Sequence, residues 1–93
     1  MATGKEKSKR AGARRKLGYN QQRALEQLPG QIDALEQDIA RLEAKLADAA
    51  FYARDPAGFD ETAAALTRAR EDKASAEEEW LALEVLREEQ ESS

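Results

Sequence analysis

Seven basic side chains lie within the first 16 residues, and their chemistry suits one class of ligand. Residues 1–16 contain a single acidic residue, Glu6, so this segment carries a net charge of +6. Clustered lysines and arginines neutralise the phosphates of nucleic acid and release its counterions, independently of base sequence. The core of the predicted phosphate-binding segment is Lys9, Arg10, Arg14, Arg15 and Lys16. The same charge could instead aid solubility, or the segment could fold back on an acidic part of the chain.

The rest of the chain is acidic, but the acidity is uneven. Residues 17–93 hold eight basic and 18 acidic side chains, whereas residues 40–70 balance at five of each and residues 71–93 sum to −7. Nucleic acid should therefore contact the 40–70 region in preference to the C-terminal part. Three cations within residues 17–93 could add to the phosphate-binding surface: Arg23, Arg41 and Lys45. They could equally be ordinary charged residues on solvated helix faces. Arg68 and Arg70 should lie on the opposite helix, near the level of Arg41 and Lys45.

Several other chemistries are excluded by what the chain lacks. It has no Cys and no His, so it offers no disulfide, thiolate nucleophile, imidazole base or zinc-type ligand set. Its carboxylates are expected on a narrow helix without a pocket that could tune them for acid–base work. The Gly4-Lys5 pair lacks the earlier glycine and the following hydroxyl of a P-loop. We predict a non-catalytic chain without a metal site and without a cofactor of its own.

The apolar pattern bears on location as well. The longest unbroken apolar run, Ala49 to Ala53, is far too short to cross a bilayer, and no signal-type segment follows the basic N-terminus. We therefore expect a cytoplasmic protein that does not enter a membrane.

Residues 17–93 contain two heptad-like patterns, which we call seams, each marking the face of a helix that packs against another helix. In the first, apolar residues recur at alternating spacings of three and four from Leu25 to Ala49. The second is weaker and has the same spacing: Phe59, Thr62, Leu66, Ala69, Lys73, Ala76, Trp80, Leu83 and Arg87. Pro29, followed by Gly30, should interrupt the first seam, because proline removes a helical donor and clashes with the preceding turn. The expected elements are a disordered basic tail over 1–16, and a domain over 17–93 with helices at about 19–27, 31–49 and 56–89. The last helix should begin at Asp55-Pro56, an N-cap followed by a residue preset for the first turn.

The two seams pair as an antiparallel hairpin if facing residue numbers add to 108. Leu42 then faces Leu66, and Leu35 faces Lys73, while Glu36 should lie near Arg70. This predicts an all-α fold: an antiparallel two-helix coiled-coil hairpin with a short kinked N-terminal helix. At the tip, Phe51 and Tyr52 could pack over the hairpin end or stack on bases.

Short motifs along residues 16 to 89 resemble the C-terminal domain of ABC-F ATPases of the Uup type. The entry motif of that family is similar to the stretch from Lys16 to Pro29, KLGYNQQRALEQLP. Gly18, Asn20 and Gln21 depart from it, but Gln21 can still reach back to cap the helix that starts after Gly18. The tip and closing motifs of the family match the following residues: Asp48, Phe51, Tyr52, Asp55, Trp80, Leu83 and Glu84.

The resemblance implies a non-catalytic accessory domain of a parent protein with two ATP-binding cassettes. It implies DNA binding by this domain, ribosome-associated work by the parent, and ATP as a cofactor of the parent alone. The expected partners are DNA or ribosomal RNA, which phosphate contacts cannot distinguish, and the ATPase modules of the parent chain. We expect a monomer. The alternative is a structural or protein-interaction coiled coil that docks on a protein partner or on the ribosome.

Overall fold

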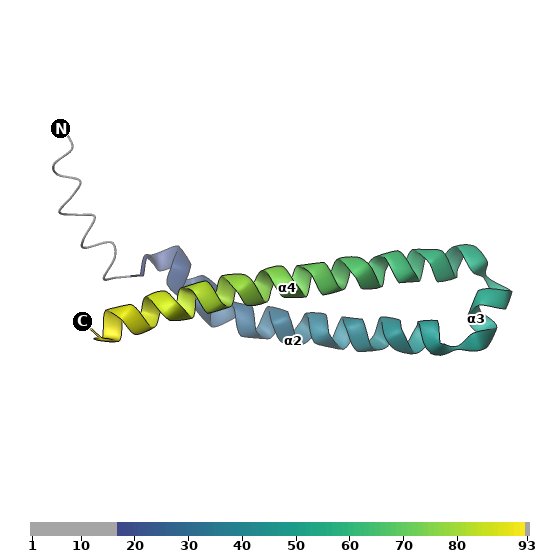
Figure 1. Cartoon of the computed structure of the whole chain (residues 1–93), viewed down its shortest axis with the longest axis horizontal. Coiled ribbons are helices and arrows are strands. Elements are labelled where there is room, and N and C mark those ends of the chain that lie inside the picture. Colours follow the sequence, from purple (N-terminus) through teal and green to yellow (C-terminus); the bar gives the residue numbers. More distant parts are fainter. Residues whose placement is uncertain (1–16, 93) are drawn as a thin grey trace, which may run out of the picture. The chain divides into compact units, whose positions relative to one another are not determined.

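The structure is a computed structural model that describes residues 17–92. Within that range it contains three helices and no strand: α2 (Tyr19–Ala47), α3 (Ala49–Arg54) and α4 (Pro56–Ser92) (Figure 1). The predicted all-α fold class is therefore confirmed. The basic segment that was predicted to be a disordered tail, residues 1–16, lies outside the described residues.

Apart from helix ends that shift by two or three residues, with α2 ending at Ala47 and α4 at Ser92, two features differ from the sequence prediction. The expected helices at 19–27 and 31–49 are one helix, because α2 runs through Pro29. A proline removes one hydrogen bond from the ladder, and the bonds on either side of it maintain the helix. The second difference is α3, a six-residue helix in the segment expected to be a turn. Asp48 is its N-cap and accepts a hydrogen bond from the backbone N–H of Ala50 at 3.0 Å.

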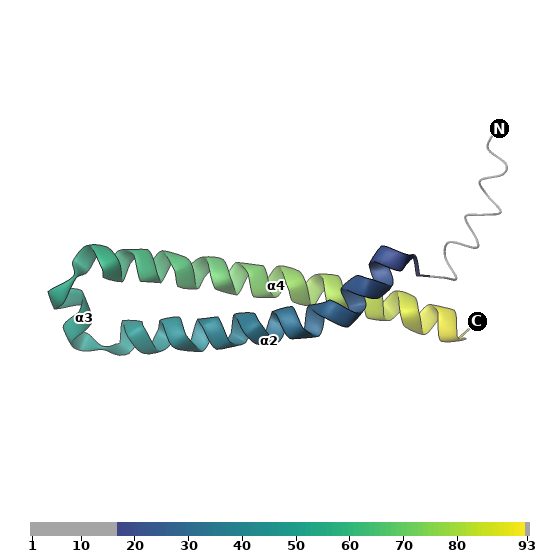
Figure 2. The ribbon, with the colours of Figure 1, turned by 180° about the vertical axis from the view of Figure 1, so that it is seen from behind.

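The chain divides into two compact units. We call Gly30–Glu77 the hairpin unit; the base unit comprises the described residues up to Pro29 together with those from Glu78 onwards. In the hairpin unit, the segments of α2 and α4 lie side by side and are joined by α3, as both views show (Figures 1 and 2). Their order is antiparallel, because Glu36 pairs with Lys73 at 3.7 Å whereas the later Glu43 pairs with the earlier Arg70 at 2.5 Å.

The interior of the hairpin unit follows the predicted seams. On α4, Thr62, Leu66 and Ala69 are buried, and on α2 the seam residues are half-buried: Ile32, Leu35, Ile39, Leu42 and Leu46. Thr62 is a buried polar residue whose hydroxyl donates to the Gly58 carbonyl at 2.8 Å. This bond offsets the cost of removing the hydroxyl from water.

One residue both ends α3 and begins α4. The backbone N–H of Asp55 donates to the Phe51 carbonyl at 2.8 Å, which closes α3. The Asp55 carboxylate then accepts from the Gly58 N–H at 3.0 Å, while Pro56 occupies the first position of α4. Because the first N–H groups of a helix lack partners within it, this carboxylate is an N-cap of the kind that Asp-Pro predicts.

The base unit has its own small core and its own helix cap. Leu17, Leu28 and Leu83 are buried there. The Gly18 N–H donates to the side-chain carbonyl of Gln21 at 2.9 Å, so the predicted reach of Gln21 back to the helix start is confirmed. This is half of a capping box, with glycine in place of the usual hydroxyl residue.

Candidate nucleic-acid interface

The eight predicted phosphate-binding residues divide between described and undescribed parts of the chain. Five of them lie outside the described residues: Lys9, Arg10, Arg14, Arg15 and Lys16. The other three are on α2, but Arg23 belongs to the base unit whereas Arg41 and Lys45 belong to the hairpin unit. Each of these three side chains has its own local contacts, which decide how available its charge is.

Arg23 lies beside an exposed tyrosine near the start of α2. Its guanidinium is 5.8 Å from the centre of the Tyr19 ring and donates to the Tyr19 hydroxyl at 3.3 Å. Tyr19 is 70% exposed and Arg23 is exposed as well, so both side chains are accessible to solvent. Such a contact orients an arginine without neutralising it, and the Arg23 charge remains able to meet a phosphate.

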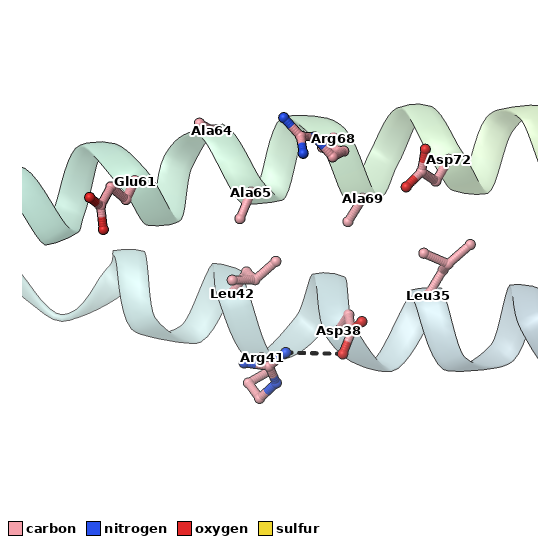
Figure 3. A pocket seen from close by; sticks show the side chains of 10 residues that line it. All are labelled: Leu35, Asp38, Arg41, Leu42, Glu61, Ala64, Ala65, Arg68, Ala69 and Asp72. Carbon is pink, nitrogen blue, oxygen red and sulfur yellow. Dashed lines mark hydrogen bonds and ion pairs between the residues drawn. The ribbon is translucent and has the colours of Figure 1, made fainter.

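Arg41 lines a groove along one side of the hairpin unit. It forms an ion pair with Asp38 at 3.0 Å (Figure 3). Arg68 of α4 lines the same groove, in agreement with the prediction that it lies opposite Arg41 on the other helix. Leu42 of α2 and Ala65 and Ala69 of α4 point towards the opposite helix in this region (Figure 3). Three carboxylates also line the groove: Asp38, Glu61 and Asp72. The two arginines are therefore outnumbered by acids, so the groove alone is a weak phosphate site.

Arg70 contributes to the opposite side of the hairpin unit. With Glu36 it lines a second groove, but its ion pair is with Glu43, which lies nearer the tip. Helical side chains tilt towards the N-terminus of their helix, so in an antiparallel pair Arg70 leans towards the tip and Glu36 leans away from it. Glu43 leans back towards Arg70, which explains why the predicted neighbour is not the ion-pair partner.

Lys45 lies at the tip of the hairpin unit, among aromatic side chains. Its ammonium is 5.5 Å from the centre of the Phe51 ring, and the Arg54 guanidinium is 5.8 Å from the same centre. The sequence prediction did not include Arg54 among the site residues. Its position directly before the Asp55 cap and after Phe51-Tyr52 was the available signal, since α3 is too short to carry Arg54 away from those rings.

Lys73 is the one half-buried cation of the predicted seam in the hairpin unit. It pairs with Glu77 at 2.8 Å and Glu36 at 3.7 Å. The hydrogen bond to Glu77 raises the pKa of the Lys73 ammonium, and both carboxylates add to that effect while desolvation opposes it. The Lys73 charge is therefore engaged by the protein's own acids and is a poor candidate for binding phosphate.

The same holds for Arg87 in the base unit. It pairs with Glu84 and, at 3.2 Å, with Glu91. The hydrogen bond to Glu84 raises the pKa of the Arg87 guanidinium. Because the surrounding part of α4 is rich in glutamates, this end of the helix repels rather than attracts a polyanion.

Two further kinds of site are absent from residues 17–92. No helix in that range is long and apolar enough to span a membrane. The same residues contain no group of three or more acidic side chains arranged to hold a metal ion.

Comparison with known proteins identifies relatives of this chain. The ABC transporter C-terminal domain family matches residues 16–85. The chain is also similar to the ATP-binding protein Uup of Escherichia coli strain K12, at 35% identity over 72 residues. The matched stretch covers 77% of this chain but only 11% of that relative. No solved structure matches the chain.

Proposed function

Because the chain belongs to the ABC transporter C-terminal domain family, we propose that it is a non-catalytic, DNA-binding accessory domain of a cytoplasmic ATP-binding protein. Its basic residues contact the phosphate backbone, and the ATP-binding modules of the parent protein supply the ATPase activity. The hairpin unit orients those modules on the nucleic acid. The resemblance to the ATP-binding protein Uup over most of the chain supports the link to such a parent.

The observation that carries the proposal is the separation of charge along the chain. Residues 1–16 have a net charge of +6, whereas residues 71–93 sum to −7. A short segment of this density attracts phosphate strongly, because binding releases condensed counterions. The exposed Arg23, just after the start of α2, extends the basic track into the described part of the chain.

The charges of residues 17–93 favour phosphate binding by the N-terminal segment over binding by the hairpin unit. The groove that contains Arg41 and Arg68 also contains three carboxylates, so it can support but not dominate phosphate binding. Affinity should come mainly from the N-terminal segment and should depend little on base sequence, since phosphate contacts position a protein without reading sequence.

Fluorescence anisotropy with a labelled DNA duplex, measured over a series of salt concentrations, tests the proposal. If five cations neutralise phosphates, log affinity should fall with log salt concentration at a slope of about −4.5. Replacing Lys9, Arg10, Arg14, Arg15 and Lys16 with Gln should remove most of the affinity and most of the slope. Arg87→Gln, which removes a cation that already pairs with two glutamates, is the matched control and should change neither.

A flat salt dependence, or full affinity after the five substitutions, would contradict the proposed mechanism. Repeating the titration with a structured RNA decides between DNA and ribosomal RNA as the preferred partner. Binding of RNA at least tenfold tighter than DNA at the same salt concentration would replace DNA in the proposal.

A second candidate, docking on a protein partner, has one specific observation in its favour. Leu81 and Val85 are 56% and 52% exposed, and they lie four residues apart on α4, so they share one helix face. A pair of this size is within what monomeric proteins expose. We therefore propose a monomer, and sedimentation at low and high salt checks it. A dimer that persists at high salt and is lost in Leu81→Glu would favour the protein-interaction function.

A further inference from the structure

We infer that the tip of the hairpin unit is a stacking site for an unpaired base of single-stranded DNA, with Tyr52 as the stacking platform. The inference rests on the proposed function, because it assigns a second contact on the same nucleic acid. It differs from that proposal in its chemistry: the N-terminal segment binds phosphate in any DNA, whereas the tip would select strands whose bases are free.

The tip holds three aromatic rings, Phe51, Phe59 and Tyr52, which we call the aromatic cluster; the Phe59 ring contacts both of the others. The Phe59 ring centre is 5.7 Å from that of Phe51 and 5.2 Å from that of Tyr52. The Tyr52 and Phe59 planes are nearly perpendicular, at 83°. Edge-to-face contacts of this kind fix ring orientation, so Phe59 holds Tyr52 in place.

The members of the aromatic cluster differ in exposure. Phe51 is 8% exposed and serves as the apolar anchor of the tip, whereas Tyr52 is 56% exposed. Successive residues of a helix point about 100° apart, so the two neighbours cannot both face inward. Tyr52 is thus a large, oriented and accessible ring, which is the requirement for stacking on a base.

Two cations lie beside the aromatic cluster. Lys45 and Arg54 each approach the Phe51 ring, at 5.5 and 5.8 Å, and both side chains are exposed. The Arg54 guanidinium also forms a long ion pair with Asp48, at 3.9 Å. A nucleotide stacked on Tyr52 would therefore have phosphate-binding groups within reach of its backbone.

The acids of the tip oppose binding less than their number suggests. The Asp48 carboxylate accepts from the Ala50 N–H, and the Asp55 carboxylate accepts from the Gly58 N–H, each at 3.0 Å. Carboxylates at helix N-termini are partly compensated by the positive end of the helix dipole. Asp60 and Glu61 are exposed on the first turns of α4 and are further acids that a bound strand would meet.

Single strands are favoured over duplexes by this geometry. A base within a duplex is already stacked on both faces and cannot reach a side chain at the end of a hairpin without being extruded. An unpaired base has a free face, and its stacking on an aromatic ring tolerates any base identity. The tip should accordingly add affinity for single strands without adding sequence preference.

The test measures binding of the full 93-residue chain to an oligodeoxyuridine of about 12 nucleotides, a usual footprint for such sites. A DNA duplex of equal length and the ribonucleotide of identical base sequence are the comparison ligands. Tyr52→Leu keeps an apolar contact with Phe59 but removes the stacking face, and it should weaken single-strand binding about fivefold or more. Tyr52→Phe should retain the affinity, and Tyr52→Leu should leave duplex binding unchanged.

Tyr19→Leu is the matched control, because Tyr19 is an exposed tyrosine beside an arginine in the base unit. It should not lower the preference for single strands. NMR adds a direct readout: the ring protons of Tyr52 should shift upfield when oligodeoxyuridine is added, as expected for a stacked ring. Circular dichroism of Tyr52→Leu confirms that its helices are retained.

The outcomes separate this inference from the proposed function. Duplex binding that depends on salt, together with unchanged single-strand affinity in Tyr52→Leu, would overturn the stacking site and leave the proposed function standing. Tyr52-dependent binding that survives neutralisation of the five N-terminal cations would support the stacking site and overturn the electrostatic mechanism. Tighter, Tyr52-dependent binding of the ribonucleotide would overturn the assignment to DNA.

Discussion

The carboxylate of Asp55 occupies the space that a side chain at Gly58 would need. It accepts a hydrogen bond from the Gly58 N–H at 3.0 Å, and a Cβ atom on Gly58 would overlap the same carboxylate. Glycine at this position therefore allows close approach of the cap rather than an unusual backbone angle. Helix propensity and helix capping oppose each other at residue 58, and this conflict can be measured.

A double-mutant cycle on these two residues should show strong coupling. Asp55→Ala removes the N-cap and should destabilise the chain by about 1 kcal/mol. Gly58→Ala in the original chain should bring no gain, because displacing the Asp55 carboxylate cancels the better propensity of alanine. In the Asp55→Ala background the same change should stabilise by roughly 0.5–1 kcal/mol. Urea unfolding followed by circular dichroism measures all four variants; additive effects would contradict the steric explanation.

Gly30 offers the same substitution without the conflict. It lies inside α2, and nothing lies within 4 Å of a Cβ atom placed on it. Gly30→Ala should therefore stabilise the chain by roughly 0.5–1 kcal/mol, mainly because glycine loses more backbone entropy on folding. The unfolding midpoint in urea should rise with an unchanged m-value. A loss of stability would indicate that α2 requires the conformational freedom of glycine next to Pro29.

The register of the hairpin unit can be tested at Leu42. This half-buried residue lines the groove with Ala69, and the predicted pairing places it opposite the buried Leu66. Leu42→Glu should cost about 2 kcal/mol or more, because it removes apolar burial and places a carboxylate in the helix interface. Leu81→Glu is the control, since Leu81 is 56% exposed. Equal losses in thermal melts of the two variants would refute the seam.

Periodicity predicted the packing of this chain well because it reports directly on which helix face is buried. Residues at the predicted seam positions from Leu25 to Leu46 are half-buried or buried, as are those from Phe59 to Arg87. Ala49, the last predicted position of the first seam, is exposed and begins α3 instead. The N-termini of α2 and α4 were also predictable, because each depends on a hydrogen bond between residues three apart: Gln21 to the Gly18 N–H, and Asp55 to the Gly58 N–H. Local chemistry and period thus predicted most of the fold.

Pro29 and α3 were predicted less well for physical reasons. The sequence prediction expected Pro29 to interrupt the helix, whereas only the hydrogen bond at the proline itself is lost and the bonds on both sides maintain α2 through it. The segment of α3 is too short to display a period, although Asp48 provided an N-cap signal. The sequence also left open whether Phe51 and Tyr52 pack or stack. Their opposite exposures follow from helical geometry, which becomes visible only once α3 is recognised.

Lys73 should make the stability of the chain depend on pH in the alkaline range. Its hydrogen bond to Glu77 raises the pKa of the ammonium above the ordinary value of 10.5, so the folded state binds this proton more tightly than the unfolded state. The resulting stabilisation is complete below the unfolded pKa and is lost as the pH rises through the folded pKa. Thermal melts of the original chain and of Lys73→Met, from neutral pH to about pH 12, should therefore show a stability difference that shifts in favour of the variant as the pH rises above about 10.5. Contributions that the two proteins share cancel in that difference. A difference independent of pH would mean that the Lys73 ion pairs with Glu36 and Glu77 contribute nothing to folding.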